Sequence, residues 1–550
     1  MLNFLHIWFI ESKKMKRLNH SLRFFSCCLS LIFSHSAVAQ NHEVFLSRNY
    51  DYKFQSYLNK QDVSFHSSIK PLNNYDIKKR KVEYEFGVPF KGFNSKEVEG
   101  HKSKVQVRFF PLIEISGTAV SDVVDTFAYN MGIGAAAVVQ AGEKFNARIE
   151  FTGSKFQYPD YLKREVESTS VGANGQLWHQ ESNGYHSTNL NGFLDYRPGE
   201  VFHFRIGHGR NFIGEGYRSM MLSDNAGNYS YGRMTADIWR LKYMVLYAHL
   251  KDQGTNKGHK YQDFDNKFTT VHYLSWNINK WFNLGFFESV VWPGRDTLLD
   301  RGYDPNYLNP VIFMRPVEYS TGSSDNSLLG IALNFKPKNG WTIYSQLVLD
   351  EFLLSELQAD VKDLVKPDPA RISGWWANKY AFQLGVKAHN IFGVSGLGVQ
   401  SEFNLVRPFT YSHGNSVQNF GHLNRSLAHP LGSNFYESIS FISYQFGNSL
   451  LEVKTQFFQQ GHSTDSTNFG EDIFQTYRSR SREYGHYTGQ GIVRTISAIG
   501  VGYNYIIVPE SNLRLFADFT IRNQNWITKR TDIFLSLGIR SSITNRYSDI

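Results

Sequence analysis

Strict alternation of apolar and polar residues near the C-terminus is the feature that most limits what this chain can fold into. In one segment, every second position is apolar, at Leu513, Leu515, Ala517, Phe519 and Ile521. In the next segment, the alternating apolar residues are Ile533, Leu535, Leu537 and Ile539. Side chains alternate across a strand with period two, so each segment is predicted to be a β-strand with one apolar and one polar face.

Similar segments recur back to about residue 105. The predicted strands cover residues 105–115, 129–140, 145–152, 187–196, 201–208, 240–250, 268–279, 281–291, 326–336, 341–351, 379–389, 396–406, 436–446, 449–459, 494–505, 512–522 and 531–541. Tight turns and long loops alternate between them, except between residues 208 and 280. A strand at about 230–238 that turns tightly near Trp239 restores this order. It also gives eighteen strands, and bacterial single-chain barrels have an even number.

The N-terminus has the pattern of a secretory signal peptide. A basic stretch up to Arg23 precedes a short apolar core from Phe24 to Phe33. Residues Ala37-Val38-Ala39 then offer a cleavage site before Gln40. The leader reads equally well from Met1 or from Met15.

Both cysteines of the chain, Cys27 and Cys28, lie in this leader. The mature chain is therefore predicted to contain neither disulfides nor cysteinyl metal sites. The alternative for the leader is a lipoprotein signal acylated at Cys27. That alternative would cut the apolar core short.

Composition narrows the class of protein. Aromatic residues make up 15% of the chain, and they serve both strands and the girdles of membrane barrels. A mean hydropathy of −0.38 and the lack of a long apolar run after the leader argue against membrane-spanning helices. Removal of residues 1–39 lowers the formal net charge from +9 to +5 (53 basic minus 48 acidic residues), which is mild for a mature chain of this size. No nucleic-acid motif is visible, so no nucleic-acid partner is expected. The prediction is an all-β barrel exported to the bacterial outer membrane, in contact with its lipid. Because only apolar side chains tolerate hydrocarbon, the lipid face is predicted to include Phe202, Phe204, Leu513, Leu515, Phe519, Leu535 and Leu537. A soluble multi-sheet sandwich is the alternative.

Three regions follow from these patterns. Residues 1–39 are the predicted signal peptide, and residues 105–550 are the predicted transmembrane barrel. Residues 40–104 alternate poorly and are predicted to be a periplasmic lead-in or a partial plug. Their basic run at 78–81 is interpreted as a solvated face.

The long loops are where binding is expected, because a rigid scaffold presents them at one end. The six longest cover residues 153–186, 209–229, 292–325, 352–378, 407–435 and 460–493. They are predicted to be extracellular or to fold into the lumen. Residues 351–365 have leucines and valines at helical spacing, which predicts a short amphipathic helix. This helix either caps the barrel mouth or binds a partner.

Several loop motifs resemble a known family. Residues 209–226, which end in Ser-Met-Met-Leu-Ser-Asp-Asn-Ala, look like the signature of Wzi-like capsule-assembly outer-membrane proteins. Residues 374–380, 407–413 and 427–432 resemble the RemB-like gliding-motility branch of that family. The resemblance runs from about residue 43 to the C-terminus. It implies a partly plugged barrel of eighteen strands that binds or organises surface polysaccharide without enzymatic activity. It also implies roles in capsule or exopolysaccharide assembly and in gliding motility or adhesion, with other surface proteins as partners.

Six loop residues are the candidates for contact with polysaccharide. They are Arg218, Trp375, Trp376, Arg407, Tyr411 and His413. Aromatic rings can stack on sugar faces, and arginines can pair with acidic sugars. Packing that anchors the loops is the alternative for each of them.

Signals for a metal or for catalysis are weak. Three histidines, His413, His422 and His429, crowd one loop near Glu437, but their spacing does not fit a zinc site. No G-x-S-x-G or H-E-x-x-H motif is present, so no catalytic residue, metal or cofactor is predicted. Two alternatives stay open at this point. One is a channel for small solutes or oligosaccharides, and the other is a hydrolase whose residues come from different strands.

Overall fold

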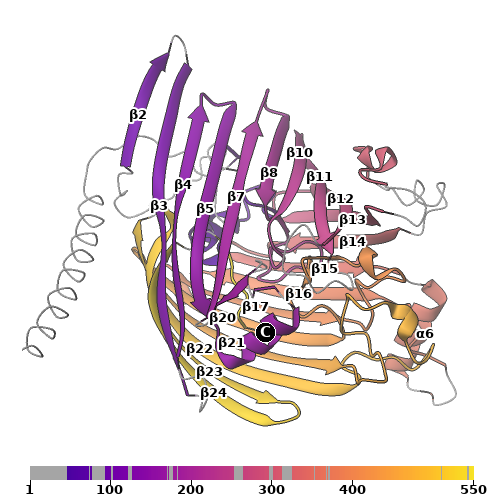
Figure 1. Cartoon of the computed structure of the whole chain (residues 1–550). Coiled ribbons are helices and arrows are strands. Elements are labelled where there is room, and N and C mark those ends of the chain that lie inside the picture. The colour runs from indigo at the N-terminus through magenta and orange to yellow at the C-terminus, as the bar shows by residue number, and fades with distance from the viewer. Residues whose placement is uncertain are drawn as a thin grey trace, which may run out of the picture.

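The computed structural model of the chain contains a closed barrel of antiparallel strands (Figure 1). It describes residues 46–73, 75–76, 93–100, 103–121, 127–169, 171–172, 178–181, 184–252, 264–295, 301–312, 325–351, 353–366, 368, 372–508, 511–541 and 544–549. The predicted signal peptide with its cleavage site at Ala39 and Gln40, and the basic run at 78–81, lie outside these residues. Among the residues described, no helix is long and apolar enough to span a membrane.

Eighteen strands form the wall of the barrel. They are β3 (Ser103–Val120), β4 (Phe127–Ala141), β5 (Phe145–Gln157), β7 (Gly184–Tyr196), β8 (Phe202–Gly209), β10 (Tyr229–Ile238), β11 (Leu241–Asp252), β12 (Asp265–Asn277), β13 (Phe282–Pro293), β14 (Asn326–Phe335), β15 (Trp341–Leu349), β16 (Tyr380–His389), β17 (Leu397–Val406), β20 (Phe435–Phe446), β21 (Ser449–His462), β22 (Ile492–Val508), β23 (Leu513–Asn525) and β24 (Lys529–Ser541). Two shorter strands extend the sheet, β2 (Phe93–Gly100) beside β3 and β6 (His179–Glu181) beside β7.

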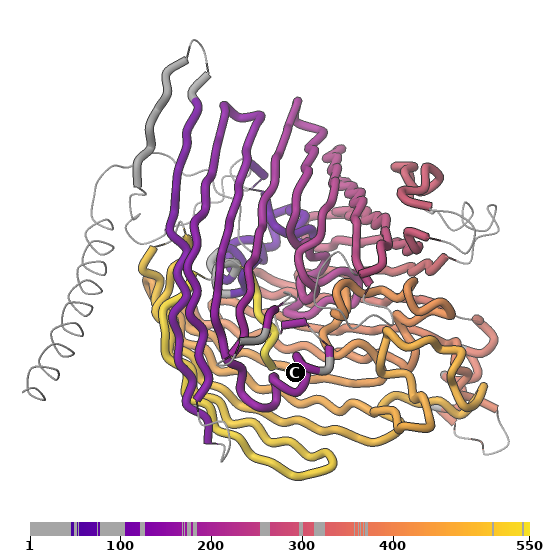
Figure 2. The backbone as a smooth tube through the Cα atoms, viewed as in Figure 1, coloured from indigo at the N-terminus to yellow at the C-terminus, as the bar shows by residue number. Residues whose placement is uncertain are grey.

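The first and last wall strands close the barrel. β24 pairs with β3 from Phe534 opposite Val120 to Arg540 opposite Glu114. Figure 2 shows these two strands side by side, in purple and yellow. A closed barrel leaves no long unpaired edge, which is a condition for a sheet in hydrocarbon.

The strand predictions are confirmed. Each of the seventeen predicted segments forms a wall strand, with bounds shifted by a few residues. The eighteenth strand, predicted at about 230–238, is β10, and it turns directly into β11 through Trp239 and Arg240. Trp239 adopts a left-handed φ of 55°, which lets this turn be so short.

Connections sort by length as predicted. At one end, β10 and β11 are joined by two residues, as are β20 and β21 through Gly447 and Asn448. The long connections lie at the other end of the barrel. They include the loop from β15 to β16 and the loop from β21 to β22. In outer-membrane barrels the long loops are extracellular. We therefore call this end the mouth.

The outer surface of the wall is apolar. Phe202, Phe204, Leu515, Phe519 and Leu535 were all predicted to face lipid, and all are exposed on the outside of the barrel, as is Leu537. Most of their inward-facing neighbours along the strands are polar or small, and Phe516 and Phe534 are large apolar exceptions. This is the alternation that a membrane barrel requires.

One facing prediction was wrong. Leu513 was placed on the lipid face, yet only 7% of its surface is exposed. It begins β23 next to a register shift between Ile506 and Val508 of β22. The regular alternation starts only after that irregular pairing, because an extra residue in one strand disturbs the facing of its neighbours.

Short elements lie in the loops and inside the barrel. The helices are α2 (Arg48–Leu58), α4 (Asp160–Thr169) and α6 (Leu354–Val365), with 3₁₀ turns η2 (Pro305–Leu308), η3 (Ile391–Gly393), η4 (Ser416–Gln418) and η5 (Tyr477–Ser479). Two small sheets pair β1 (Ile69–Lys70) with β9 (Phe212–Ile213), and β18 (Gly421–His422) with β19 (Arg425–Ser426). α6 confirms the helix predicted within residues 351–365.

Candidate functional site

Four segments fill much of the barrel interior. They are residues 46–73, residues 210–228, residues 407–434 and the C-terminal tail 544–549. Apolar side chains of the first three, such as Ile69, Met221 and Leu427, share one buried cluster with inward-facing wall residues. Figure 2 shows the indigo N-terminal segment within the outline of the barrel. The hydrophobic core of this protein therefore lies inside the barrel, where it holds the loops in place.

Wall side chains fix the backbone of the loop 210–228 by hydrogen bonds. Glu402 of β17 accepts from the backbone N–H groups of Tyr217 and Arg218, at 2.8 and 3.0 Å. Gln346 of β15 accepts from the N–H of Met220 at 2.8 Å. A buried N–H without a partner is costly, so these bonds specify how the loop sits in the barrel.

Arg218 is the centre of a buried ionic network. Its guanidinium lies 2.9 Å from Glu437 Oε1 and 3.1 Å from Asp549 Oδ1, and His429 lies 2.7 Å from Glu437 Oε2. Burial alone lowers the pKa of Arg218, but the two carboxylates outweigh it and hold that pKa well above its ordinary value. The network ties two interior loops and the C-terminal tail to strand β20.

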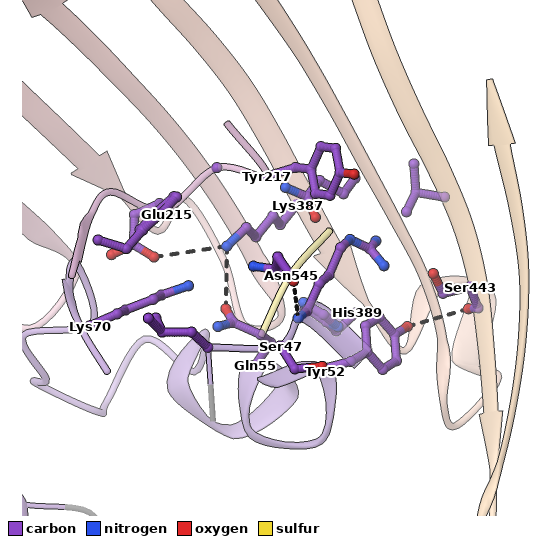
Figure 3. A pocket seen from close by; sticks show the side chains of 16 residues that line it. Ser47, Tyr52, Gln55, Lys70, Glu215, Tyr217, Lys387, His389, Ser443 and Asn545 are labelled. Atoms are coloured by element: carbon purple, nitrogen blue, oxygen red, sulfur yellow. Dashed lines mark hydrogen bonds and ion pairs between the residues drawn. The ribbon is translucent and has the colours of Figure 1, made fainter. Parts of the chain in front are cut away.

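The N-terminal segment is attached to the wall at β16 and β20 (Figure 3). Tyr52 of α2 donates to the backbone oxygen of Ser443 at 3.3 Å. Lys387 of β16 lies 3.4 Å from Gln55 and 3.9 Å from Glu215. The pocket left between them has a volume of about 50 Å³. At roughly 10–15 Å³ per water, it has room for only a few water molecules.

At the mouth, aromatic residues from three loops pack around Trp376. Its ring centroid lies 6.3 Å from that of Phe409 and 4.6 Å from that of Tyr477. The guanidinium of Arg480 lies 3.9 Å above the Trp376 ring. We call Trp375, Trp376, Phe409, Tyr477 and Arg480 the mouth cluster.

Arg407 joins the mouth cluster to α6. It donates to the backbone oxygen of Trp375 at 3.2 Å and lies 3.4 Å from Asp360 of α6. Asp360 also accepts from the backbone N–H of Gly374 at 2.7 Å and from Asn378 at 2.8 Å. These contacts hold α6 and the tryptophan segment as one unit.

His413 and Tyr411 continue the same loop inward. The His413 ring meets Tyr477 edge to face at 5.8 Å, and burial lowers the pKa of His413 to about 4. Tyr411 is fully buried and donates to the backbone oxygen of Met220 at 2.6 Å. Its backbone N–H donates to Asp350 at 2.7 Å.

The six predicted contact residues thus occupy two places. Trp375, Trp376, Arg407 and His413 lie together around the mouth cluster, whereas Arg218 and Tyr411 lie deeper in the interior. The six also differ in burial, because Arg218 and Tyr411 have no exposed surface and Trp375 is the only one of the six that is not buried. Whether any of them contacts polysaccharide stays a prediction. In this conformation Trp375 is the one that solvent reaches most readily.

A set of exposed charged and aromatic groups at the mouth was missed. The loop between β21 and β22 presents Arg478 and Arg482 to solvent, together with Tyr484 and Tyr487. Within the described part of the chain, neither of these arginines has a carboxylate partner, whereas Arg480 pairs with Glu483 at 2.6 Å. The alternating arginines of residues 478–482, flanked by tyrosines, were the available sequence signal.

The three loop histidines lie apart from one another, and each makes its own contacts. His422 accepts from the backbone N–H of Lys251 at 2.9 Å, and His429 pairs with Glu437. The residues that the structure describes contain no group of His, Cys, Asp and Glu that could hold a metal ion.

A larger cavity remains beside the filled part of the interior. It has a volume of about 420 Å³ and lies against the inward faces of β3, β4 and β21 to β24. α4 lines it near the mouth, and Arg48 at the start of α2 lines it at the other end.

The closed barrel, its apolar outer surface and its loop-filled interior define an outer-membrane barrel fold. Wzi of Escherichia coli, described as an outer membrane protein involved in group 1 capsule assembly and a carbohydrate-binding β-barrel, has a similar structure. The TM-score is 0.53 at 11% identity, and the match covers 92% of this chain and 100% of that one. This similarity confirms the predicted fold.

Other solved barrels are more distant. OccK8 of Pseudomonas aeruginosa matches with a TM-score of 0.39 at 9% identity, over 80% of this chain and 97% of that chain. OpdK of the same organism, solved with vanillate, matches with a TM-score of 0.41 at 9% identity, over 80% and 98%. No family model matches the sequence. No curated protein matches it either.

Proposed function

We propose that this barrel binds or organises surface polysaccharide in capsule or exopolysaccharide assembly, as a non-enzymatic protein of the bacterial outer membrane. The observation that carries the proposal is the exposed arginine and tyrosine surface beside the mouth cluster. The fold similarity to Wzi, which is described as carbohydrate-binding, supports it. The resemblance of the loop motifs to gliding-motility proteins extends the proposal to gliding or adhesion, with other surface proteins as partners.

We assign the contact with polysaccharide to exposed side chains at the mouth. Tyr484 and Tyr487 are 39% and 61% exposed and offer flat rings for sugar faces. Arg478 and Arg482 offer planar forks that pair bidentately with the carboxylates of acidic sugars. Trp375 borders the same surface. Two exposed arginines without a carboxylate partner among the described residues favour an acidic polymer.

The predicted contact residues with little exposure have a different role in this proposal. Trp376, Arg407 and His413 support the surface from below, because they hold its loops together. Arg218 and Tyr411 hold the interior loops. Residues 46–73 serve as a partial plug, and the leader exports the chain.

The experiment uses a deletion strain complemented with wild-type or variant protein. Arg478→Gln combined with Arg482→Gln removes both unpaired charges while the loop keeps hydrogen-bonding groups of similar length. We expect the double variant to reach the outer membrane normally and to retain several-fold less polysaccharide at the cell surface. Arg240→Gln, at the opposite end of the barrel, is the matched control and should retain the wild-type amount.

Two results would contradict the proposal. One is a deletion strain that retains as much surface polysaccharide as its parent. The other is a double variant that complements as well as wild type. Spreading and adhesion are scored on the same strains, so that a role in motility without a role in polysaccharide retention is visible.

A channel is the second candidate function, because the cavity of about 420 Å³ is not filled by the interior segments. Passage of a solute through the barrel would require α4 and the start of α2 to move, because they line the two ends of the cavity. Single-channel conductance of the purified protein in a planar bilayer tests it. A stable open conductance in wild type would favour the channel over a plugged binding protein.

A further inference from the structure

The inward side chains of one part of the wall keep the large cavity open. Many of those that line it from β3, β22 and β24 are small, at Ser116, Thr118, Ala498, Gly500, Gly502 and Ser536. Elsewhere the interior is occupied by large side chains such as Tyr273 and Tyr344, both fully buried. The side chains of the wall therefore set the width of this cavity. We call the cavity the lane.

Most charges that line the lane pair with one another. Arg48 pairs with Glu452, Lys454 with Asp549, and Arg546 with Glu114. Three lining charges remain, Arg522, Arg540 and Asp518. In the described part of the chain, none of these three has an ion-pair partner. The excess charge of the lane is therefore positive.

Arg522 is the most unusual of these groups. Only 3% of its surface is exposed, and its Nε and Nη2 atoms have no hydrogen-bond partner among the described residues. Nη1 donates to Gln524 at 3.3 Å, and the guanidinium lies 4.4 Å above the ring of Tyr161. Arg540 stacks in the same way on Phe516, at 4.4 Å, with its Nε unpartnered. Buried donors without acceptors cost free energy, which a ligand that supplies acceptors would recover.

The two arginines lie toward opposite ends of the lane. Arg522 is opposite Asp532 in the sheet register, and Arg540 follows eight residues later on the same strand. At about 3.3 Å per residue, this span is roughly 26 Å along the strand. Between the arginines the lining carries hydroxyl and amide groups, such as Thr118, Thr520 and Asn130. A ligand that fits has a carboxylate for an arginine and several hydroxyls for the wall.

We propose that the lane is a binding site for a small hydroxylated carboxylate, a sugar acid, held by Arg522 beneath α4, with Arg540 as a second carboxylate position. The ring of Tyr161 and the unpartnered atoms of Arg522 form the outer end of the site. The inference does not depend on the polysaccharide surface, because the two sites share no residue.

α4 is the lid of this site. Tyr161 donates to the backbone oxygen of Ser548 at 2.6 Å, and Asp160 pairs with Arg530 of β24 at 2.8 Å. Both contacts attach the start of the helix over the lane. Removing the Tyr161 ring widens the entrance and leaves the wall unchanged.

The test is calorimetric titration of the purified full-length mature protein with glucuronate at low ionic strength, with glucose as the neutral ring of the same size. We expect glucuronate to bind at least about tenfold more tightly than glucose, because a charge-assisted bond to a buried guanidinium is strong. Arg522→Gln should weaken glucuronate binding about tenfold or more, and Arg522→Lys should weaken it less. Arg240→Gln, at the short-turn end of the barrel, should leave it unchanged.

Equal or absent binding of glucuronate and glucose by wild type would overturn the inference, as would an Arg522→Gln protein that folds and binds like wild type. Heat-modifiable mobility on gels shows which variants are folded. If Arg522→Gln does not fold, the comparison of the two ligands on the Arg478→Gln, Arg482→Gln double variant, which lacks these two mouth charges, still decides. Tyr161→Ala should speed glucuronate association, which stopped-flow tyrosine fluorescence measures. Surface retention of polysaccharide is scored separately, so this inference and the proposed function fail independently.

Discussion

The guanidinium of Arg480 lies 3.9 Å above the ring of Trp376, and through this contact the loop from β21 to β22 rests on the loop from β15 to β16. Tyr477 covers the same ring at 4.6 Å, and Arg407 holds the neighbouring backbone. The exposed groups at 478–487 therefore stand on a packed base. Their positions depend on a residue that itself has little exposed surface.

Trp376→Ala should weaken binding of the host polysaccharide about tenfold, because it removes an aromatic and cation–π base worth about 1–2 kcal/mol. Trp376→Phe should recover part of the loss. Retention of labelled polysaccharide by purified protein measures both. The control is Trp239→Ala at the short-turn end, where the ring is 80% exposed. An equal loss in that control would show that the effect is not specific to the mouth.

Arg218→Ala should destabilise the folded protein by about 3–5 kcal/mol, because Glu437 would then be buried without its guanidinium partner. Urea titration followed by gel mobility gives the free energy of unfolding. We also expect the loop 210–228 to become sensitive to protease. Arg240→Ala is an exposed control and should cost less than about 0.5 kcal/mol. A stable, protease-resistant Arg218→Ala protein would show that the ionic network does not hold the interior loops in place.

Leu535→Arg should destabilise the barrel by about 2–4 kcal/mol if the outer face contacts hydrocarbon near its middle. Ile527→Arg provides the comparison. It lies in the turn between β23 and β24 at the mouth, is 78% exposed, and should cost at most about 1 kcal/mol. Folding into lipid vesicles in a urea series measures both. Similar costs at the two positions would argue against a membrane-facing wall.

The stability of the mouth should fall as the pH is lowered from about 6.5 to about 4. Burial lowers the pKa of His413 to about 4, so over this range the unfolded chain binds a proton that the folded chain does not. Above pH 6.5 the stabilisation that this difference in pKa gives the folded protein is fully present, and it is worth roughly 3 kcal/mol at most. His413→Gln should flatten the pH dependence of the melting temperature. His179→Gln, at an exposed position, should leave the slope as in wild type.

Much of the wall could be predicted from the sequence, because neighbouring residues of a strand face opposite sides of the sheet. Leu515 and Phe519 show the pattern directly. The β10 strand followed from the order of short and long connections, and not from its own residues. Leu513 was misplaced because the register shift beside it depends on the partner strand, and no local pattern records it.

The interior and the mouth were less predictable because their contacts join distant parts of the chain. Arg218 pairs with Glu437, 219 residues away, and with Asp549 in the tail. Sequence motifs brought out Trp375, Trp376 and Arg407 as a group, and the structure places them together. The low exposure of Trp376 depends on Tyr477 and Arg480, from a loop whose alternating arginines were not considered.

Salt-dependent binding of host polysaccharide to the purified barrel tests the central claim most directly. At low salt, wild type should retain the polymer, and the Arg478→Gln, Arg482→Gln double variant should bind it several-fold more weakly. The difference should vanish at about 1 M salt, where the Debye length is about 3 Å and exposed charges are screened. Purified wild type and variant that both retain no host polysaccharide at low salt would contradict the claim.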